Sequence, residues 1–266
     1  MPELPEVETI KRDLEGTVLR KKISEVIINN PAVIRQPGPA AFKSGLKNAV
    51  IKNILRRAKV LILELSNGKA LTIHLKMTGQ LVYPGNGKSS RVSFRFSGND
   101  LLDFNDQRLF ADLRLLDDWR DLKFIKELGP EPFDLTTQSF KKLLSGKKTR
   151  IKPLLMDQAF IAGIGNLYAA EILFRAKINP ERPASSLTDA EKTLLFKEIV
   201  TVLDEAITCG GSSIDDYVRV SGKRGDYARK HRIYGRQGKP CLVCKTVIKK
   251  IAMGGRGTCF CPRCQK

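Results

Sequence analysis

The chain has 266 residues, of which 42% are hydrophobic and 28% are charged, as expected for a soluble globular protein with one large or two medium domains. Lys and Arg exceed Asp and Glu by 47 to 28, and a surface with this excess attracts polyanions. Apolar runs such as Val60 to Leu63 are too short to span a bilayer, and no secretion-signal pattern opens the chain, so we expect a cytoplasmic protein without a membrane partner.

The first predicted element is a helix that begins near Pro5, because proline suits a first helical turn. Apolar residues follow it at helical spacing: Val7, Ile10 and Leu14. Pro2 and Glu3 stand before this helix. Methionine before a small residue is commonly removed, and Pro2 would then carry a free secondary amine; an α-amino group has a pKa of about 7.7 to 8.0, so part of it is an unprotonated nucleophile. From spacing alone, a structural role for both residues is still favoured.

The region up to about Leu116 is predicted to consist of strands and turns. Two β-rich runs, LILEL and ALTIHL, flank Asn67-Gly68, which is a hairpin signal, and VSFRF and LLDF continue the pattern. This pattern favours an antiparallel β-sandwich or barrel with a helix packed beside it.

A domain boundary is predicted at residues 128–134, where prolines and a glycine interrupt the chain and helical periodicity follows. The expected helices are SFKKLL, LLMDQAF, NLYAAEILF and the run 188–207, which opens on a Thr188/Glu191 capping box and closes before Gly210-Gly211. The turn GIGN at 163–166 suits either phosphate binding or a tight connection between two helices.

Four cysteines near the end of the chain have the spacing of a structural zinc site: Cys241, Cys244, Cys261 and Cys264. A module this short has little apolar material, whereas a structural zinc contributes about 10 to 16 kcal/mol to folding. We therefore predict one structural Zn²⁺. Cys259 could compete with Cys261 for the metal, and Cys209 is expected to be an inert core thiol.

Residues 217–266 carry 14 basic side chains against one acidic residue, Asp226. A zinc module this basic favours nucleic-acid binding over catalysis, because four thiolates leave the metal no open position for water. Any chemistry is then expected elsewhere in the chain.

Several motifs follow one another in a fixed order: PELPEVE at 2–8, HLKMTG at 74–79, LGPEP at 128–132, GIGNLYAAEILF at 163–174 and RGTCFCPRCQK at 256–266. In these motifs the chain resembles the formamidopyrimidine-DNA glycosylase / endonuclease VIII family, most closely its first branch. The resemblance implies an α+β multidomain fold. Its domains would be an N-terminal antiparallel β-sandwich with flanking helices (1–130), a helix-two-turn-helix domain (131–230) and a β-hairpin zinc finger (231–266).

The resemblance further implies a DNA glycosylase and apurinic/apyrimidinic lyase of base excision repair that acts on oxidised purines. Pro2 would attack the sugar, displace the damaged base and form a Schiff base from which β- and δ-elimination nick the strand. Glu3 would assist sugar opening, with Glu6 in support. Lys59 and Arg256 would contact phosphates and assist catalysis.

The same resemblance implies a set of DNA contacts. Met77, Arg108 and Phe110 would fill the space left by an everted base, although from the residues alone the first and last would be core and Arg108 a surface charge. The loop 221–230 would cap the damaged base. The other DNA-binding candidates are His74, Lys147, Lys152, Asn166 and Tyr234. For His74, a hydrogen-bonded structural role is about equally expected.

Three stretches depart from the family pattern. Leu109 and Ala111 flank Phe110 where a basic residue and a glycine are usual, which leaves the preferred opposite base open. The stretch Lys88-Ser89-Ser90-Arg91 lacks the usual histidines, and Cys259 replaces another histidine.

These inferences predict a monomeric bacterial enzyme that acts on damaged double-stranded DNA in the cytoplasm, associated with the nucleoid. Two alternatives stay open. One is an oxidised-pyrimidine glycosylase similar to endonuclease VIII, and the other is a non-catalytic protein that binds damaged DNA.

Overall fold

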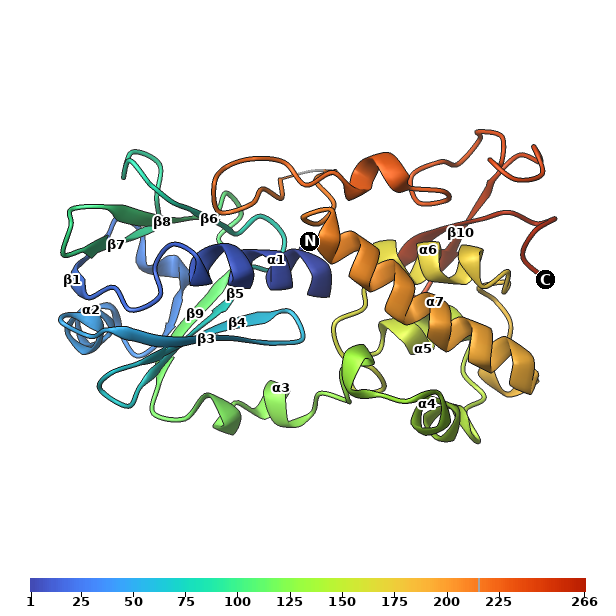
Figure 1. The fold of residues 1–266 in the computed structure, drawn as a ribbon, viewed down its shortest axis with the longest axis horizontal. Coiled ribbons are helices and arrows are strands. Elements are labelled where there is room, and N and C mark those ends of the chain that lie inside the picture. The colour runs from blue at the N-terminus through green and yellow to red at the C-terminus, as the bar shows by residue number, and fades with distance from the viewer. Residues whose placement is uncertain (215) are drawn as a thin grey trace. The chain divides into compact units, whose positions relative to one another are not determined.

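The structure is a computed structural model that describes residues 1–214 and 216–266 (Figure 1). It divides into two compact units, each made from two stretches of chain: 1–126 with 207–228, and 127–206 with 229–266. The three-domain division drawn from the sequence stays a prediction. Within the described residues, no helix is long and apolar enough to cross a membrane.

The described part of the first unit contains two β-sheets, with strand orders β1-β7-β8-β6 and β2-β9-β5-β4-β3. The strands are β1 (Ile23–Ile28), β2 (Ile34–Gln36), β3 (Ile51–Arg57), β4 (Val60–Leu65), β5 (Ala70–His74), β6 (Gln80–Val82), β7 (Val92–Phe96), β8 (Leu101–Asn105) and β9 (Asp112–Leu116). The predicted hairpin is confirmed, since β4 pairs antiparallel with β5 across a turn in which Gly68 has a φ of +82°. The pair β2–β9 is parallel.

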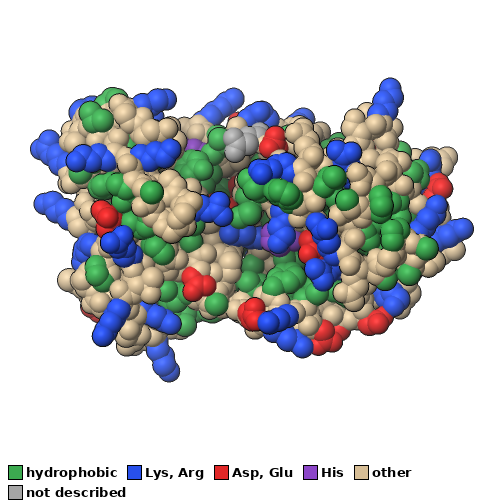
Figure 2. Space-filling view, turned by 180° about the vertical axis from the view of Figure 1, so that it is seen from behind, with side chains coloured by type: hydrophobic (Ala, Val, Ile, Leu, Met, Phe, Trp, Pro, Cys, Tyr) green, Lys and Arg blue, Asp and Glu red, His purple; other side chains and the backbone are tan. Residues whose placement is uncertain are grey.

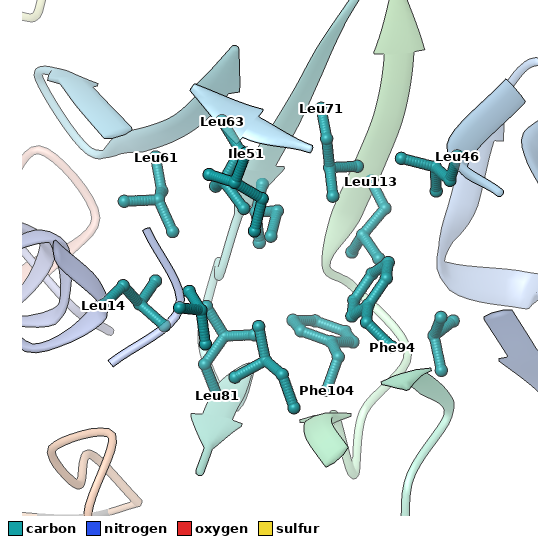
Figure 3. Packing of buried hydrophobic residues seen from close by; sticks show 14 of the residues in the cluster. Leu14, Leu46, Ile51, Leu61, Leu63, Leu71, Leu81, Phe94, Phe104 and Leu113 are labelled. Carbon is teal, nitrogen blue, oxygen red and sulfur yellow. The ribbon is translucent and has the colours of Figure 1, made fainter. Parts of the chain in front are cut away.

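The core of the first unit is built by the alternation of apolar side chains along the strands (Figure 3). On β4, Leu61 and Leu63 join the main cluster with Phe94 and Phe104, while Val60 and Ile62 belong to a second cluster on the other face of the sheet. Both faces of β4 are therefore covered, which explains why its sequence is a continuous apolar run.

The longer helices among residues 1–126 are α1 (Leu4–Glu15) and α2 (Pro39–Leu46). Helix α1 starts with Pro5 in its first turn and buries Val7, Ile10 and Leu14, as predicted. Helix α2 lies in the region expected to hold only strands and turns, so that expectation is wrong there. Proline at its first position and the buried pair Phe42 and Leu46, four residues apart, are ordinary helix signals that the short segment hides.

The longer helices of the second unit are α4 (Thr137–Leu144), α5 (Ile151–Met156), α6 (Asn166–Arg175) and α7 (Asp189–Thr208), of which residues 207–208 are assigned to the first unit. The helix predicted over 154–160 is partly wrong, because α5 ends at Met156. The side chain of Gln158 accepts a hydrogen bond from the Gly163 N–H (2.9 Å) and donates one to the Ile164 carbonyl (2.7 Å), so it closes a loop where a helix would continue.

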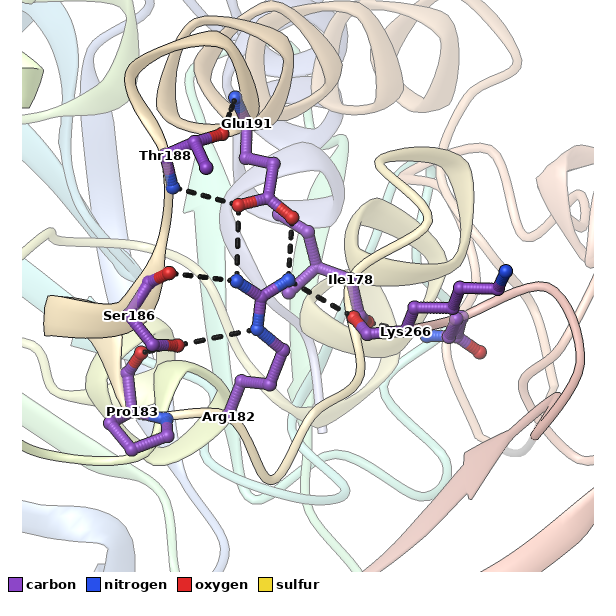
Figure 4. Close-up of polar contacts among 8 residues, drawn as sticks. Ile178, Arg182, Pro183, Ser186, Thr188, Glu191 and Lys266 are labelled. Carbon is purple, nitrogen blue, oxygen red and sulfur yellow. Dashed lines mark hydrogen bonds and ion pairs between the residues drawn. The ribbon is translucent and has the colours of Figure 1, made fainter.

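The capping box predicted at the start of α7 is confirmed (Figure 4). The Thr188 N–H donates to the Glu191 carboxylate (2.7 Å), and the Glu191 N–H donates to the Thr188 hydroxyl (3.2 Å). Arg182 donates to both oxygens of the same carboxylate and to the carbonyl of Lys266. The C-terminal end of the chain is thereby tied to the start of α7.

The chain ends in an antiparallel hairpin of β10 (Lys249–Met253) and β11 (Arg256–Phe260). Gly254 and Gly255 form its turn with φ values of +54° and +70°, as a two-residue hairpin turn requires. The remaining short helices are η1 (Pro31–Val33), η2 (Trp119–Asp121), α3 (Lys123–Lys126), η3 (Pro132–Asp134), η4 (Ala184–Ser186) and η5 (Tyr227–Lys230).

Candidate active site and nucleic-acid interface

Pro2, Glu3 and Glu6 lie together at the buried start of α1. The Glu6 carboxylate accepts hydrogen bonds from the backbone N–H of Glu3 (2.8 Å) and of Ser212 (2.9 Å). Gly211 has a φ of +81°, and a Cβ there would lie only 3.1 Å from Cγ of Glu6, so glycine is needed for this approach. Glu6 thus fixes the backbone that follows Pro2 against the loop 211–212.

Met77, Arg108 and Phe110 form one exposed group in the first unit. Met77 is 40% exposed and Phe110 is 50% exposed, so their interpretation as core residues is wrong. The Nη1 atom of Arg108 lies 3.2 Å from Sδ of Met77, and its guanidinium carbon lies 4.8 Å from the centre of the Phe110 ring. Large apolar groups held at the surface beside a cation can insert into a nucleic acid stack.

Lys59 and His74 lie near each other at one end of β4, because Lys59 occupies the turn before it and Val60 pairs with His74. Burial, with smaller contributions from the charges of Lys76 and Lys59, lowers the pKa of His74 to about 3. Its Nδ1 accepts the Lys76 N–H at 3.1 Å. His74 is therefore neutral at neutral pH and has a hydrogen-bonded structural role; a DNA contact stays a prediction.

Lys152 and Asn166 meet in the second unit. Lys152 is 1% exposed, and its Nζ donates to Oδ1 of Asn166 and to the Thr258 hydroxyl, both at 2.6 Å. Asn166 in turn donates to the carbonyl of Gly257 at 3.3 Å. These bonds join α5 and α6 to strand β11. A small pocket of about 150 Å³ lies beside them, lined by Lys152, Pro153, Met156, Asp157, Met253 and Gly254.

The other candidates of this unit lie in different settings. Arg256 is exposed directly after the Gly254-Gly255 turn, at the tip of the hairpin. Lys147 is exposed in the connection between α4 and α5. Tyr234 is half-buried against the zinc-finger core, and its N–H donates to Glu171 at 2.9 Å.

Glu171 is a residue that the sequence reasoning did not single out. It is 1% exposed, and its carboxylate accepts the backbone N–H groups of Arg232, Ile233 and Tyr234 at 2.9 to 3.1 Å. Burial raises the pKa of Glu171, while these three donors oppose the shift. The available signal was a glutamate inside the apolar run NLYAAEILF. It anchors the start of the finger to α6.

The four predicted metal ligands form one cluster, in which their sulfur atoms lie within 4.8 Å of one another. Two sulfur pairs are separated by 3.9 Å, for Cys241 and Cys264, and by 3.4 Å, for Cys244 and Cys261. Four thiolates about 2.3 Å from a tetrahedral Zn²⁺ are roughly 3.8 Å apart, so the cluster fits one structural zinc. The Cys259 sulfur instead lies 3.5 Å from Oε1 of Gln237, which confirms the predicted ligand set.

Basic side chains outnumber acidic ones on the molecular surface in view: Figure 2 shows Lys and Arg spread over the face drawn, with fewer Asp and Glu among them. A tetrathiolate zinc hairpin with an arginine at its tip, in a chain this basic, defines a zinc-finger protein of the nucleic-acid-binding class.

The comparisons with known proteins narrow this class. Family models match residues 1–113 (formamidopyrimidine-DNA glycosylase N-terminal domain), 128–218 (formamidopyrimidine-DNA glycosylase H2TH domain) and 238–266 (zinc finger found in FPG and IleRS). The formamidopyrimidine-DNA glycosylase of Pelotomaculum thermopropionicum is 43% identical over 274 aligned positions, covering 100% of this chain and 99% of the relative. That of Streptococcus pneumoniae is 40% identical, with the same coverage.

Solved structures agree with this result. Lactococcus lactis Fpg in complex with DNA containing an abasic site is 34% identical and has a TM-score of 0.91, covering 99% of each chain. The Fpg protein of Thermus thermophilus is 37% identical with a TM-score of 0.89, covering 99% of this chain and 98% of its own. The chain belongs to the formamidopyrimidine-DNA glycosylase family. It is an enzyme of the DNA glycosylase class, with the α+β fold that the sequence predicted.

Proposed function

We propose that the chain is a bifunctional glycosylase and lyase that excises oxidised purines, including 8-oxoguanine and formamidopyrimidines, from double-stranded DNA. A Lactococcus lactis relative forms a complex with DNA that contains Fapy-dG, which supports this substrate class. The observation that carries the proposal is the geometry at the start of α1. Pro2 precedes the buried Glu3 there, and the Glu6 carboxylate holds this backbone in place by accepting hydrogen bonds from the N–H groups of Glu3 and Ser212.

Pro2 acts as the nucleophile once Met1 is removed. The pyrrolidine nitrogen bonds to C1′ of the everted nucleotide while the bond from C1′ to the damaged base breaks, and the proton that the attacking amine loses leaves with the base. Glu3 then protonates O4′ as the sugar ring opens, which leaves an iminium between Pro2 and C1′. The positive end of α1 favours the neutral amine that this attack needs, and Glu3 opposes that shift.

The iminium withdraws electrons from the opened sugar and so drives strand cleavage. Loss of a C2′ proton expels the 3′ phosphate by β-elimination, and a second, δ-elimination expels the 5′ phosphate. Lys59 and Arg256 are proposed to contact these phosphates and stabilise their negative charge.

The proposed grip on DNA combines insertion with charge. Met77, Arg108 and Phe110 occupy the space of the everted base, which costs a few kcal/mol to extrude. Lys147, Lys152, Asn166 and Tyr234 are further proposed DNA-binding residues. The zinc ion supports the finger only, since its four thiolate ligands leave no position for water. We propose a monomer that works on DNA in the bacterial cytoplasm.

Borohydride trapping tests this proposal. Reduction in the presence of duplex DNA with an abasic site should yield a covalent adduct with the correctly processed protein and none with Pro2→Gly. Mass spectrometry of the native N-terminus verifies that Met1 is absent from the protein used. A processed wild-type chain that binds this DNA without forming an adduct would instead be a non-catalytic damage-binding protein.

A further inference from the structure

Asp106 is a buried carboxylate that the proposed chemistry does not use. It follows strand β8 and is 1% exposed. Its Oδ2 accepts the Ala111 N–H at 2.8 Å, and its Oδ1 accepts the Arg108 N–H at 3.2 Å and the hydroxyl of Thr78. A single side chain thus fixes both ends of the loop 108–111.

The shape of this loop depends on those bonds. Leu109 has a φ of +57°, a conformation that is uncommon for leucine. Its sequence neighbours Arg108 and Phe110 contact each other, with 4.8 Å between the guanidinium carbon and the ring centre. The Leu109 carbonyl accepts a hydrogen bond from Arg35 at 3.2 Å. Arg91 donates to the Asp106 carbonyl at 2.9 Å. This network adds to the apolar contacts of Leu109 and the buried Ala111 with the main core, and it holds the loop where Arg108 and Phe110 are exposed.

Met77, the remaining exposed residue of the group, is connected to the Asp106 carboxylate through its neighbour Thr78. Thr78 directly follows Met77, is 7% exposed, and its hydroxyl oxygen also accepts the Arg108 N–H at 3.2 Å. The next residue, Gly79, approaches Leu75 so closely that a Cβ would lie 2.5 Å from the Leu75 carbonyl. Asp106 therefore joins the two separate turns that present Met77 and the pair Arg108 and Phe110.

We propose that Asp106 is a positioning residue that sets these three side chains in the geometry needed to replace an everted base, without touching DNA itself. This inference rests on the proposed function. It predicts that Asp106 matters only where a second strand supplies an orphan base and a stacked helix. On single-stranded DNA the inserted group has nothing to replace, so catalysis there is independent of Asp106.

Asp106→Asn tests the inference with little change in shape. One carboxylate oxygen becomes an NH₂ group, which cannot accept a hydrogen bond from a backbone N–H. For nicking of an abasic-site oligonucleotide, kcat/KM on duplex should fall by about 10- to 100-fold, as expected when binding groups are misplaced. On the single strand, kcat/KM should stay within about twofold, and discrimination between opposite bases should weaken.

Asp103→Asn is the matched control. Asp103 is also a buried carboxylate on β8, 3% exposed, but it holds a different turn through the N–H groups of Asn86 (2.9 Å) and Gly87 (2.8 Å). Its substitution should lower the melting temperature and leave the ratio of duplex to single-strand activity unchanged. Equal losses on both DNA forms in Asp106→Asn, or no loss on duplex, would overturn the inference.

A binding signal separates this inference from the proposed function. With 2-aminopurine opposite the abasic site, the wild-type chain should change the fluorescence on binding, because an inserted side chain alters stacking of the orphan base. Asp106→Asn should bind with a reduced change. If the wild-type chain fails to nick DNA, the glycosylase proposal fails, and the same fluorescence comparison still decides the role of Asp106.

Discussion

The loop 106–111 and the tip of the β10–β11 hairpin both expose side chains predicted to bind DNA, but they are held in different ways. The first rests on a large apolar core and is shaped by one buried carboxylate, Asp106. The second belongs to a module whose own cluster contains two zinc-ligand cysteines, Cys241 and Cys261, among its buried residues. The loop therefore depends on the folding of the sheets, whereas the hairpin depends on a metal ion.

The hairpin also depends on its neighbours within the second unit. Thr258 and Gly257 bond to Lys152 and Asn166, and the side chain of Gln265 donates to the Ile178 carbonyl at 2.9 Å. Loss of the metal would remove partners from a buried lysine, so the effect should extend beyond the finger into α5 and α6.

The largest expected effect comes from removing zinc. Cys244→Ser removes one of the four thiolate ligands, so this variant should lose the one equivalent of zinc per chain. Because structural zinc contributes about 10 to 16 kcal/mol to folding of such a module, the finger should then lose its structure. Hydrogen exchange should show amides of β10 and β11 losing protection while those of β4 and β5 keep theirs.

Cys259→Ser is the control for that substitution. Its sulfur belongs to the same module but lies outside the four-sulfur cluster. Metal analysis should find full zinc in this variant. Two results would contradict the conclusion that only the hairpin depends on the metal. One is full zinc in Cys244→Ser, and the other is an equal loss of protection in the sheets and the hairpin.

A second prediction compares the arginines of the two regions. If the chain neutralises about six phosphates, the logarithm of its DNA affinity falls with the logarithm of salt concentration at a slope of about −5. Arg256→Ala should reduce that slope by about 1 and weaken binding roughly tenfold, whatever the opposite base. Arg108→Ala should leave the slope nearly unchanged and alter opposite-base discrimination. Equal slopes in Arg256→Ala and wild type would remove Arg256 from the phosphate contacts.

The sequence predicted those features of the molecule that repeat or have a fixed spacing. The two β-rich runs around Asn67-Gly68, helical spacing in α1 and the cysteine pairs each follow from one local rule. The short α2 and the early end of α5 did not, because a single side chain such as Gln158 can end a helix through contacts that no periodicity records. The role of Asp106 had no local signal either, since Thr78, one of its partners, lies far away in sequence.

A third prediction concerns acid stability of the first unit. His74 has a native pKa of about 3, lowered chiefly by burial, against about 6.5 when unfolded. The unfolded chain therefore binds a proton that the native chain does not, and stability falls as the pH drops from about 6.5 toward 3. Between pH 7 and 5 this loss is about 2 kcal/mol. In His74→Asn, which keeps an acceptor near Nδ1, urea unfolding should show a weaker pH dependence by that amount; identical dependence would mean that His74 titrates normally.

The smallest expected effect concerns the ion pair between Arg182 and Glu191 at the start of α7 in the second unit. Hydrogen bonding to Arg182 is the main cause that lowers the pKa of Glu191 to about 2. The pair therefore stabilises the native state at pH values above 4.5, the ordinary pKa of a glutamate, and this stabilisation is lost as the pH falls toward 2. Because the pair is partly exposed, Arg182→Ala should cost only about 1 kcal/mol at pH 7 in urea unfolding, and less at pH 3. Arg182→Lys keeps the charge but loses the forked donors, so it should recover only part of the loss. Full recovery with lysine would show that the positive charge is sufficient and that the forked geometry of the Arg182 donors, which reach both Glu191 and the Lys266 carbonyl, adds nothing measurable.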